Sequence, residues 1–433
     1  MSMTTIGILG IVILLILLFS RMPVAFVMAM LGCAGFSYVV NPSAGIAMLG
    51  QDIYETFSSY GLTVIPLFVL MGQIAFQAGI SRRLYDSAYI LVGHKPGGLA
   101  MATVGACAAF SAVSGSTNAT AATMAVVTLP EMKRYNYDMG LATGTVAAAG
   151  SLGILIPPSV IFIVYGILTQ ESIGKLFMAG IVPGCILTVL FLLTIYIRVK
   201  MNPSIAPAGE AFSLREKILS FIGVAEALIL FSLVMGGMFF GFFTPTEAAA
   251  VGAFLTLVIA VIRRQIDWKG LVKALGDTTR ISCMVMMIAT GAIVFGKFMA
   301  ITRIPYSLAE WIAGLPLPAT AIMGMIILVY LLGGCFMDAL AMVMLTVPIF
   351  FPVVERLGFD PIWFGVTIVL VTEMGVITPP VGINVYVVKG VATDVPLEKI
   401  FKGVLPMLLP LVLCCLMLLF FPKIATFLPS LMG

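Results

Sequence analysis

The sequence contains few charged residues, and this shortage limits what the protein can be. Acidic and basic side chains make up 10% of the 433 residues, whereas water-soluble domains average about 25%. Histidine occurs once, at position 94, so neither a histidine triad nor a histidine metal cluster can be assembled. The net charge of +4 is spread over many loops, which does not indicate a nucleic-acid-binding surface. We therefore expect no enzymatic activity, no organic cofactor and no nucleic-acid partner.

Cysteine is scarce and follows no pattern. None of the seven cysteines forms a C-x-x-C pair, and all lie in apolar segments. This arrangement supports neither a disulfide framework nor a zinc site. We expect small core residues at all seven positions, which are 33, 107, 185, 283, 335, 414 and 415.

Apolar residues, in contrast, are abundant. They make up 61% of the chain, the mean hydropathy is +1.16, and apolar runs longer than about 18 residues recur along it. Runs such as Ile6–Phe19 and Leu405–Phe421 are apolar on every side, as lipid-facing helices are, and lack the alternation of a barrel strand. The first run has Arg21 after it and no basic residue before it, which indicates a retained helix and not a signal peptide. The sequence therefore predicts an all-α polytopic membrane protein.

The apolar segments predict about ten transmembrane segments and two re-entrant hairpins. Segments 97–130 and 318–352 exceed the ~20 residues of one crossing and carry Gly, Ser, Asn or Asp near their middles. We expect each to form a helical hairpin that enters and leaves the membrane by the same face. Adjacent prolines inside 139–169 and 361–392 predict two broken helices. The other predicted segments are 3–20, 22–40, 59–79, 176–197, 221–243, 246–262, 281–301 and 403–422.

The basic residues predict the orientation of the chain. With the N-terminus outside and both hairpins re-entrant, 18 of the 23 lysines and arginines, Arg21 among them, fall on the cytoplasmic side. This bias follows the positive-inside rule and places both termini in the periplasm. A loop with Asp52 and Glu55 would face outward, and Lys297 is expected to reach the membrane interface from the outer end of its span.

Two parts of the sequence resemble each other. Thr128–Pro130 matches Thr346–Pro348 at an offset of 218 residues, and Pro157–Pro158 matches Pro379–Pro380 at an offset of 222. Because the predicted hairpins enter from opposite faces, the repeats are inverted, which is typical of secondary transporters with a site between the repeats. The predicted parts are N-terminal scaffold helices with a lead-in (1–80), a first hairpin and broken helix (97–169), further scaffold helices with a second lead-in (176–301), a second hairpin and broken helix (318–392) and a C-terminal helix (403–433).

A polar cluster interrupts the first predicted hairpin. Six hydroxyl or amide side chains lie within Ser111–Thr120, and such neutral oxygens, together with free backbone carbonyls, can replace the water shell of Na⁺. The break at Gly150–Ser159 frees carbonyls of this kind, and the start of the following half-helix favours a substrate carboxylate. Gly333–Asp338 and Thr372–Asn384 offer the same arrangement in the second repeat. Packing of small residues and proline-kinked helices is the alternative explanation.

Four acidic residues lie in or beside apolar segments. Asp338 and Glu373 fall at predicted membrane depth, where ionisable groups are costly and commonly functional. Either they bind a cation or they pair internally. Glu226 and Glu247 are expected to cap or lock helices, since Glu247 follows a helix start at Thr244.

Four motifs resemble those of the large membrane subunit of tripartite ATP-independent periplasmic (TRAP) transporters. They are, in order, Ser114–Thr120, Gly153–Ser159, Thr244–Gly252 and Gly375–Asn384. The resemblance implies an elevator mechanism in a bacterial or archaeal inner membrane, with a transport domain of hairpins and broken helices that slides against a scaffold. It also implies Na⁺ coupling and the import of an organic acid, such as a C4-dicarboxylate, a keto acid or a sugar acid like sialic acid.

The resemblance further implies two protein partners and three groups of site residues. The partners are a periplasmic substrate-binding protein and a small four-helix membrane subunit, which is expected to be a separate chain because no four-helix segment precedes the motifs. The first sodium site would comprise Ser114, Ser116, Asn118, Gly150, Gly153 and Pro157. The second would comprise Gly333, Asp338, Thr372, Thr378 and Pro379. Substrate contacts would come from Ser116, Thr117, Ser159, Gly334 and Asn384.

Three alternatives stay open at this point. A stand-alone Na⁺/dicarboxylate symporter of similar architecture would need no binding protein. A channel would need a continuous polar pore, whereas the polar residues cluster at two breaks. A membrane-embedded enzyme would need a nucleophile with a base or a metal set, neither of which the sequence displays.

Overall fold

The helices begin at residues that cap them. The structure is a computed structural model that describes residues 2–20, 22–314 and 316–432. Most long helices in this part start at Ser, Thr, Asn or Asp, whose side-chain oxygen accepts a backbone N–H that the helix leaves free. Thr244 and Glu247 form the predicted capping box. Arg21, which the charge pattern places in the cytoplasm, lies outside the described residues.

The described residues form helices and no strand. The first part comprises α1 (Met3–Phe19), α2 (Val24–Val39), α3 (Pro42–Ser58), η1 (Tyr60–Thr63), α4 (Val64–Gln77), α5 (Ile80–Val92), α6 (Gly98–Ser114), α7 (Thr117–Arg134), α8 (Met139–Gly150), α9 (Leu152–Leu155), α10 (Val160–Thr169) and α11 (Ile173–Met201). The second part comprises η2 (Pro203–Ile205), α12 (Leu214–Phe239), α13 (Pro245–Ile262), α14 (Trp268–Ile301), α15 (Ile304–Ala313), α16 (Ala319–Gly334), α17 (Ala339–Arg356), α18 (Pro361–Ile377), α19 (Ile383–Val391), α20 (Leu397–Phe420), α21 (Lys423–Thr426) and η3 (Pro429–Leu431).

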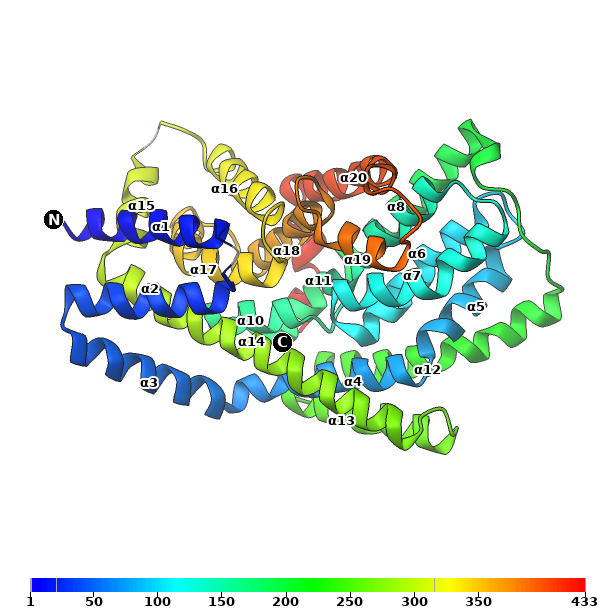
Figure 1. The fold of residues 1–433 in the computed structure, drawn as a ribbon, viewed down its shortest axis with the longest axis horizontal. Coiled ribbons are helices and arrows are strands. Elements are labelled where there is room, and N and C mark those ends of the chain that lie inside the picture. Colours follow the sequence, from blue (N-terminus) through cyan, green and yellow to red (C-terminus); the bar gives the residue numbers. More distant parts are fainter. Residues whose placement is uncertain (1, 21, 315, 433) are drawn as a thin grey trace.

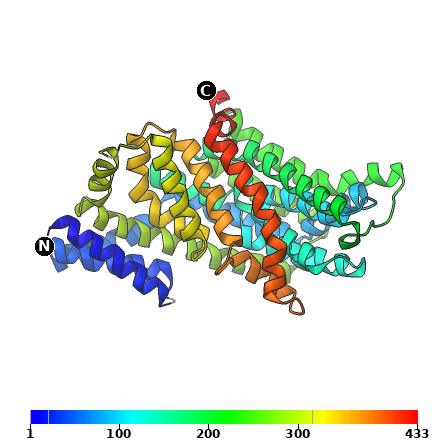
Figure 2. The same ribbon diagram turned by 90° about the horizontal axis from the view of Figure 1, so that it is seen from above.

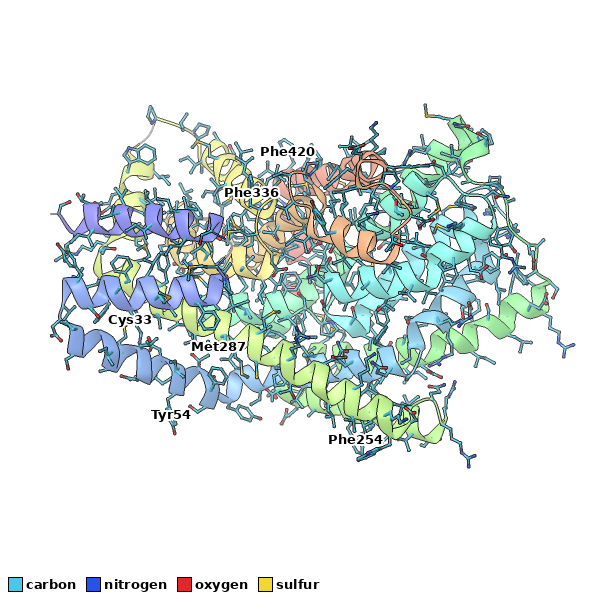
Figure 3. All side chains as sticks on the ribbon, viewed as in Figure 1. Cys33, Tyr54, Phe254, Met287, Phe336 and Phe420 are labelled. Atoms are coloured by element: carbon cyan, nitrogen blue, oxygen red, sulfur yellow. The ribbon has the colours of Figure 1, made fainter. Side chains whose placement is uncertain are left out.

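Many of these helices are suited to a membrane. Among the described residues, eight helical stretches are long and apolar enough to cross one, and α8–α10 count together as one of them. Large apolar side chains such as Tyr54, Phe254 and Phe420 point outward (Figure 3). Two of the cysteines, Cys185 and Cys283, are also exposed. The prediction that all seven are core residues is therefore wrong for these two, because an apolar segment of a membrane protein has a lipid-facing side as well as a buried one.

Three helices were not predicted. α3 occupies the segment expected to be an acidic external loop, and α5 and α15 occupy stretches expected to be polar connections. Each carries charged or polar residues among its apolar ones, so a search for continuous apolar runs overlooks it. Both hairpins also extend four residues beyond the prediction, to Arg134 and Arg356, because Pro130 and Pro352 lie inside their helices without ending them.

The predicted hairpins and broken helices are present. α6 and α7 pack against each other as one hairpin, here called hairpin 1, and α16 and α17 form hairpin 2. One helix breaks between α8 and α10, and another breaks between α18 and α19. Beside them, α2 packs along α14 and α13 packs along α4. Figures 1 and 2 place α1–α3 at one end of the molecule, and Figure 1 shows α5 and α12 at the other.

Two buried carboxylates join helices that are distant in sequence. Asp52 of α3 is 1% exposed and pairs with Lys297 of α14. Lys297 therefore has a specific partner although its side chain is 43% exposed, and the expectation that it reaches the membrane interface stays a prediction. Glu226 of α12 is 4% exposed and lies between Arg83, at 2.8 Å, and Arg263, so its predicted helix-locking role is confirmed.

Glycines allow the hairpin tips to touch the broken helices. A Cβ atom on Gly153 would lie 2.6 Å from the carbonyl oxygen of Ser116, at the tip of hairpin 1. A Cβ atom on Gly375 would lie 2.4 Å from the carbonyl carbon of Gly334, at the tip of hairpin 2. Each broken helix therefore supports a hairpin tip through direct backbone contact.

We expect Gly153→Ala and Gly375→Ala to destabilise the protein, because the added methyl group collides with backbone that has no space to move. Overpacking of this kind costs about 1–3 kcal/mol. Thermal unfolding in detergent measures the effect. Gly105→Ala in hairpin 1 and Gly324→Ala in hairpin 2 are the matched controls. Among the described residues, no atom outside the local helix lies within 4 Å of a Cβ at either of these positions. Equal behaviour of all four variants would contradict the packing described here.

We expect Glu226→Gln to lower the unfolding temperature by at least about 5 °C, because two arginines lose their buried counter-charge. Glu216→Gln in the same helix is the control. Glu216 is exposed and belongs to a capping box that glutamine can also form. Similar melting of the two variants would show that the Glu226 pairs contribute little.

Candidate functional site

The two hairpin tips meet at a small internal cavity. This central cavity, of about 90 Å³, lies between the hairpins, the break after α8, and helices α4 and α14. Its polar lining combines five predicted site residues with one residue from α4. They are Ser114, Ser116, Thr117, Asn118, Asp338 and Gln73.

Local sequence explains the shape of the hairpin 1 tip. Gly115 has a φ of +63°, a left-handed conformation in which a side chain would be strained and would also approach the Pro158 carbonyl. This turn ends α6 and leaves Ser116 extended, so that its hydroxyl caps α7 by accepting the Ala119 N–H at 3.3 Å. The Ser114 and Thr120 hydroxyls bond each other at 2.7 Å across the turn. The tip therefore presents ordered oxygen atoms to the cavity.

Hairpin 2 contributes a carboxylate. Asp338 caps α17 by accepting the Leu340 N–H at 3.1 Å, and it faces the central cavity. The Asn118 side chain of hairpin 1 is a hydrogen-bonding neighbour of this carboxylate. The Asp338 side chain thus serves as a helix cap and also as an acidic group next to the tip of hairpin 1.

Side chains from both repeats form a buried network beneath the tips. Thr117 of α7 donates to Glu373 of α18 at 3.3 Å, and Asn384 of α19 donates to the Thr117 hydroxyl at 2.8 Å. Asn384 also donates to the Ala147 carbonyl of α8 at 3.2 Å. These bonds join hairpin 1 and the first broken helix to the second broken helix.

Several oxygen atoms in this region have no partner. The side-chain oxygens of Asn118 and Asn384 and one carboxylate oxygen of Glu373 are buried without a hydrogen bond within the described part of the chain. An unpaired buried acceptor costs about 1–3 kcal/mol, so such atoms favour a bound cation or water. No group of three or more His, Cys, Asp or Glu among the described residues is arranged to hold a metal. The donor set is instead a few carboxylates among neutral oxygens, the type of oxygen set with which broken helices can hold Na⁺.

The structure brings together the predicted first-repeat residues more closely than those of the second repeat. Gly153 contacts Ser116, while Gly150 and Pro157 are buried behind the tip. Ser159, placed among the substrate contacts, is fully buried and caps α10 through the Phe162 N–H at 3.5 Å. Ser159 is not among the residues that line the central cavity.

Of the site residues predicted in the second repeat, only Asp338 is among the described residues that line the central cavity, beside its neighbours Ala339 and Leu340. Thr372 and Thr378 donate to carbonyls of their own helix, Pro379 is exposed, and Gly333 faces an apolar cavity beside α1 and α15. Gly334 packs on Gly375 as a backbone support. Sodium coordination by all of the predicted residues, in both repeats, stays a prediction.

Two residues of the site were missed or left undecided. For Glu373 the sequence allows either cation binding or internal pairing. In the structure one of its carboxylate oxygens accepts a hydrogen bond from Thr117 and the other has no partner among the described residues. Gln73 was not considered, because a single glutamine in an apolar run carries no signal of a site. It follows Gly72, whose Cβ would lie 3.0 Å from the Ser114 carbonyl oxygen, so α4 contacts the hairpin 1 tip directly.

The chain matches known proteins over nearly its whole length. Residues 11–424 match the family model described as the tripartite ATP-independent periplasmic transporter, DctM component. The chain is 37% identical over 389 residues to the C4-dicarboxylate TRAP transporter large permease protein DctM of Pseudomonas aeruginosa, and the match covers 90% of each protein. It is 33% identical over 421 residues to the sialic acid TRAP transporter large permease protein SiaM of Vibrio cholerae, with 96% of each covered.

Two further matches concern a longer relative and a solved structure. The isethionate TRAP transporter permease protein DctMQ of Oleidesulfovibrio alaskensis is 35% identical over 404 residues, which cover 92% of this chain and 62% of that protein. The YdaH transporter of Alcanivorax borkumensis has a similar fold, with a TM-score of 0.63 at 14% identity over 87% of this chain and 88% of that one. The family model and the relatives at 33–37% identity together show that this chain belongs to the DctM family, the large permease component of TRAP transporters.

Proposed function

We propose that this chain is the permease of a Na⁺-coupled importer of organic acids. The observation that carries the proposal is the central cavity, where the tips of two hairpins bring neutral oxygens and one carboxylate together. Membership of the DctM family supports a permease and not an enzyme. The family works with a small membrane subunit and a periplasmic binding protein. We expect this chain to do the same in the inner membrane, with its termini in the periplasm.

Two sodium sites form part of this proposal. We assign the first to the hairpin 1 tip and the adjoining break, and the second to the hairpin 2 tip. The unpaired oxygens of Asn118 and Asn384 and the carboxylate of Asp338 support a cation in this region. An organic acid would then place its carboxylate beside the bound cations. The cations would compensate the negative charge of this carboxylate, because the described side chains around the site supply no positive charge.

An elevator movement is the proposed mechanism. The hairpins and broken helices would move together, and the hydrogen bonds from Asn384 to Thr117 and to Ala147 support this because they bind the two halves of that body to each other. The helix pairs α2 with α14 and α13 with α4 would form the stationary scaffold. The two equivalent helix pairs and the two hairpins also support inverted repeats.

The candidate substrates are those of the relatives. Their names specify C4-dicarboxylates, sialic acid, isethionate and 2,3-diketo-L-gulonate, all of them organic acids. The stand-alone symporter is not favoured, because each of these relatives is named as part of a TRAP transporter.

Uptake of radiolabelled organic acids into proteoliposomes tests the proposal. The purified chain is combined with its small subunit and binding protein, each included or omitted, with and without an inward Na⁺ gradient. We expect uptake only when both partners and the gradient are present. Uptake by this chain alone would instead support a stand-alone symporter, and non-saturating flux without a gradient would indicate a channel.

Asp338→Asn tests the cation site directly. Asparagine still caps a helix, but the variant lacks the negative charge that faces the central cavity. We expect the Na⁺ concentration for half-maximal uptake to rise roughly tenfold or more, which corresponds to about 1.4 kcal/mol. Asp360→Asn is the matched control, because Asp360 caps α18 in the same way and does not line the cavity. Equal Na⁺ dependence of the two variants would remove Asp338 from the site.

A further inference from the structure

A second cavity adjoins the central one and is lined by helices from different parts of the chain, and three residues of its wall, Phe76, Val126 and Val391, are exposed. This side cavity, of about 290 Å³, lies between α4 and α5 on one side and hairpin 1 on the other. It shares Gln73 and Ser114 with the central cavity, so the two adjoin at the hairpin 1 tip. Most of its wall is apolar, and its polar lining residues are Gln73, Ser81, Ser114 and Thr123.

Three of these polar groups have no bonding partner in the protein. Gln73, Ser81 and Thr123 make no side-chain hydrogen bond within residues 2–20, 22–314 and 316–432, although Ser81 and Thr123 are only 3% and 6% exposed. Other hydroxyls of hairpin 1, such as those of Thr103 and Ser111, donate to the carbonyl four residues earlier. The oxygens of Ser81 and Thr123 are not among the buried side-chain atoms without a partner, so they reach the cavity space and are free to bond water or a polar molecule there.

The size of the central cavity leads to the same conclusion. Small-molecule sites have volumes of roughly 300–1,000 Å³, whereas the central cavity has about 90 Å³. Together with the side cavity it reaches the lower end of that range. An organic acid whose carboxylate lies at the hairpin tips therefore extends past Gln73 into the side cavity.

The side cavity carries no charged side chain among its lining residues. Arg82 lines a further cavity, which adjoins the side cavity at Val126 and Val127 and also contains Asp86 and Glu131. A second carboxylate placed in the side cavity would be desolvated without a counter-charge, which is expensive. Hydroxyl or keto groups, in contrast, would pair with the three free side chains.

We propose that Gln73, Ser81 and Thr123 form a subsite for the uncharged polar tail of the transported acid. This inference rests on the proposed function and narrows it. The substrate is an acid with one carboxylate and a hydroxylated or keto tail. Gln73 is the specificity-determining residue of the scaffold, since it contacts both cavities and its amide can donate two hydrogen bonds.

Binding of three four-carbon acids tests the subsite. Threonate has a hydroxylated tail, succinate a second carboxylate and butyrate an apolar tail, and calorimetry with the purified permease complex in Na⁺ buffer measures each affinity. We expect threonate to bind at least roughly tenfold more tightly than either of the others, since only its tail forms hydrogen bonds with the three free side chains without placing a second charge in the cavity. Gln73→Leu and Thr123→Val should each reduce threonate affinity about fivefold to tenfold and leave butyrate affinity unchanged.

Thr103→Val is the matched control, because its hydroxyl is satisfied within α6 and lines neither cavity. Threonate affinity should stay within twofold of the native value in this variant. Succinate binding as tightly as threonate, an absence of threonate binding, or an unchanged order of affinities in Gln73→Leu and Thr123→Val would each overturn the subsite. The proteoliposome assay separates the two proposals: Na⁺-dependent uptake of any organic acid keeps the proposed function even when the subsite fails.

Discussion

The structure depends on the rule that polar backbone inside a membrane must find partners within the protein. Both helix breaks leave N–H and C=O groups free at apolar depth, and both are tolerated because a hairpin tip packs against them. Gly153 and Gly375 permit this contact at backbone distance. The central cavity lies where these contacts end, so the same constraint that encloses the breaks also places free oxygens around one point.

Buried charge is handled in two different ways. Glu226 and Asp52 pair with basic residues and join helices outside the hairpins. Asp338 and Glu373 have no basic partner among the described residues and are surrounded by hydroxyls, amides and backbone. Carboxylates of the first kind hold neighbouring helices together, whereas those of the second kind lie where a cation would balance their charge.

Much of the fold and part of the site follow from the sequence. Apolar run length, the position of Gly115 and the paired prolines predict both hairpins and both breaks, because these features act locally. The helices α3, α5 and α15 are not predicted from the sequence. Their amphipathic pattern identifies a buried face only when the neighbouring helices are known, and the sequence alone does not show these neighbours. Gln73 is not predicted as a site residue for the same reason, because the contact between α4 and the hairpin 1 tip arises only in the assembled fold.

The close approach of Gly72 to the hairpin 1 tip has a kinetic consequence. Where side chains interdigitate, two helices can shift only by whole ridges, and each shift requires packed groups to separate. Here backbone faces backbone, with the Ser114 and Val113 carbonyls against a residue that has no side chain. In the proposed elevator movement, such a smooth contact would have little ruggedness along the direction of sliding, so the size of the residue at position 72 would set the resistance of that interface to sliding independently of how tightly any ligand binds.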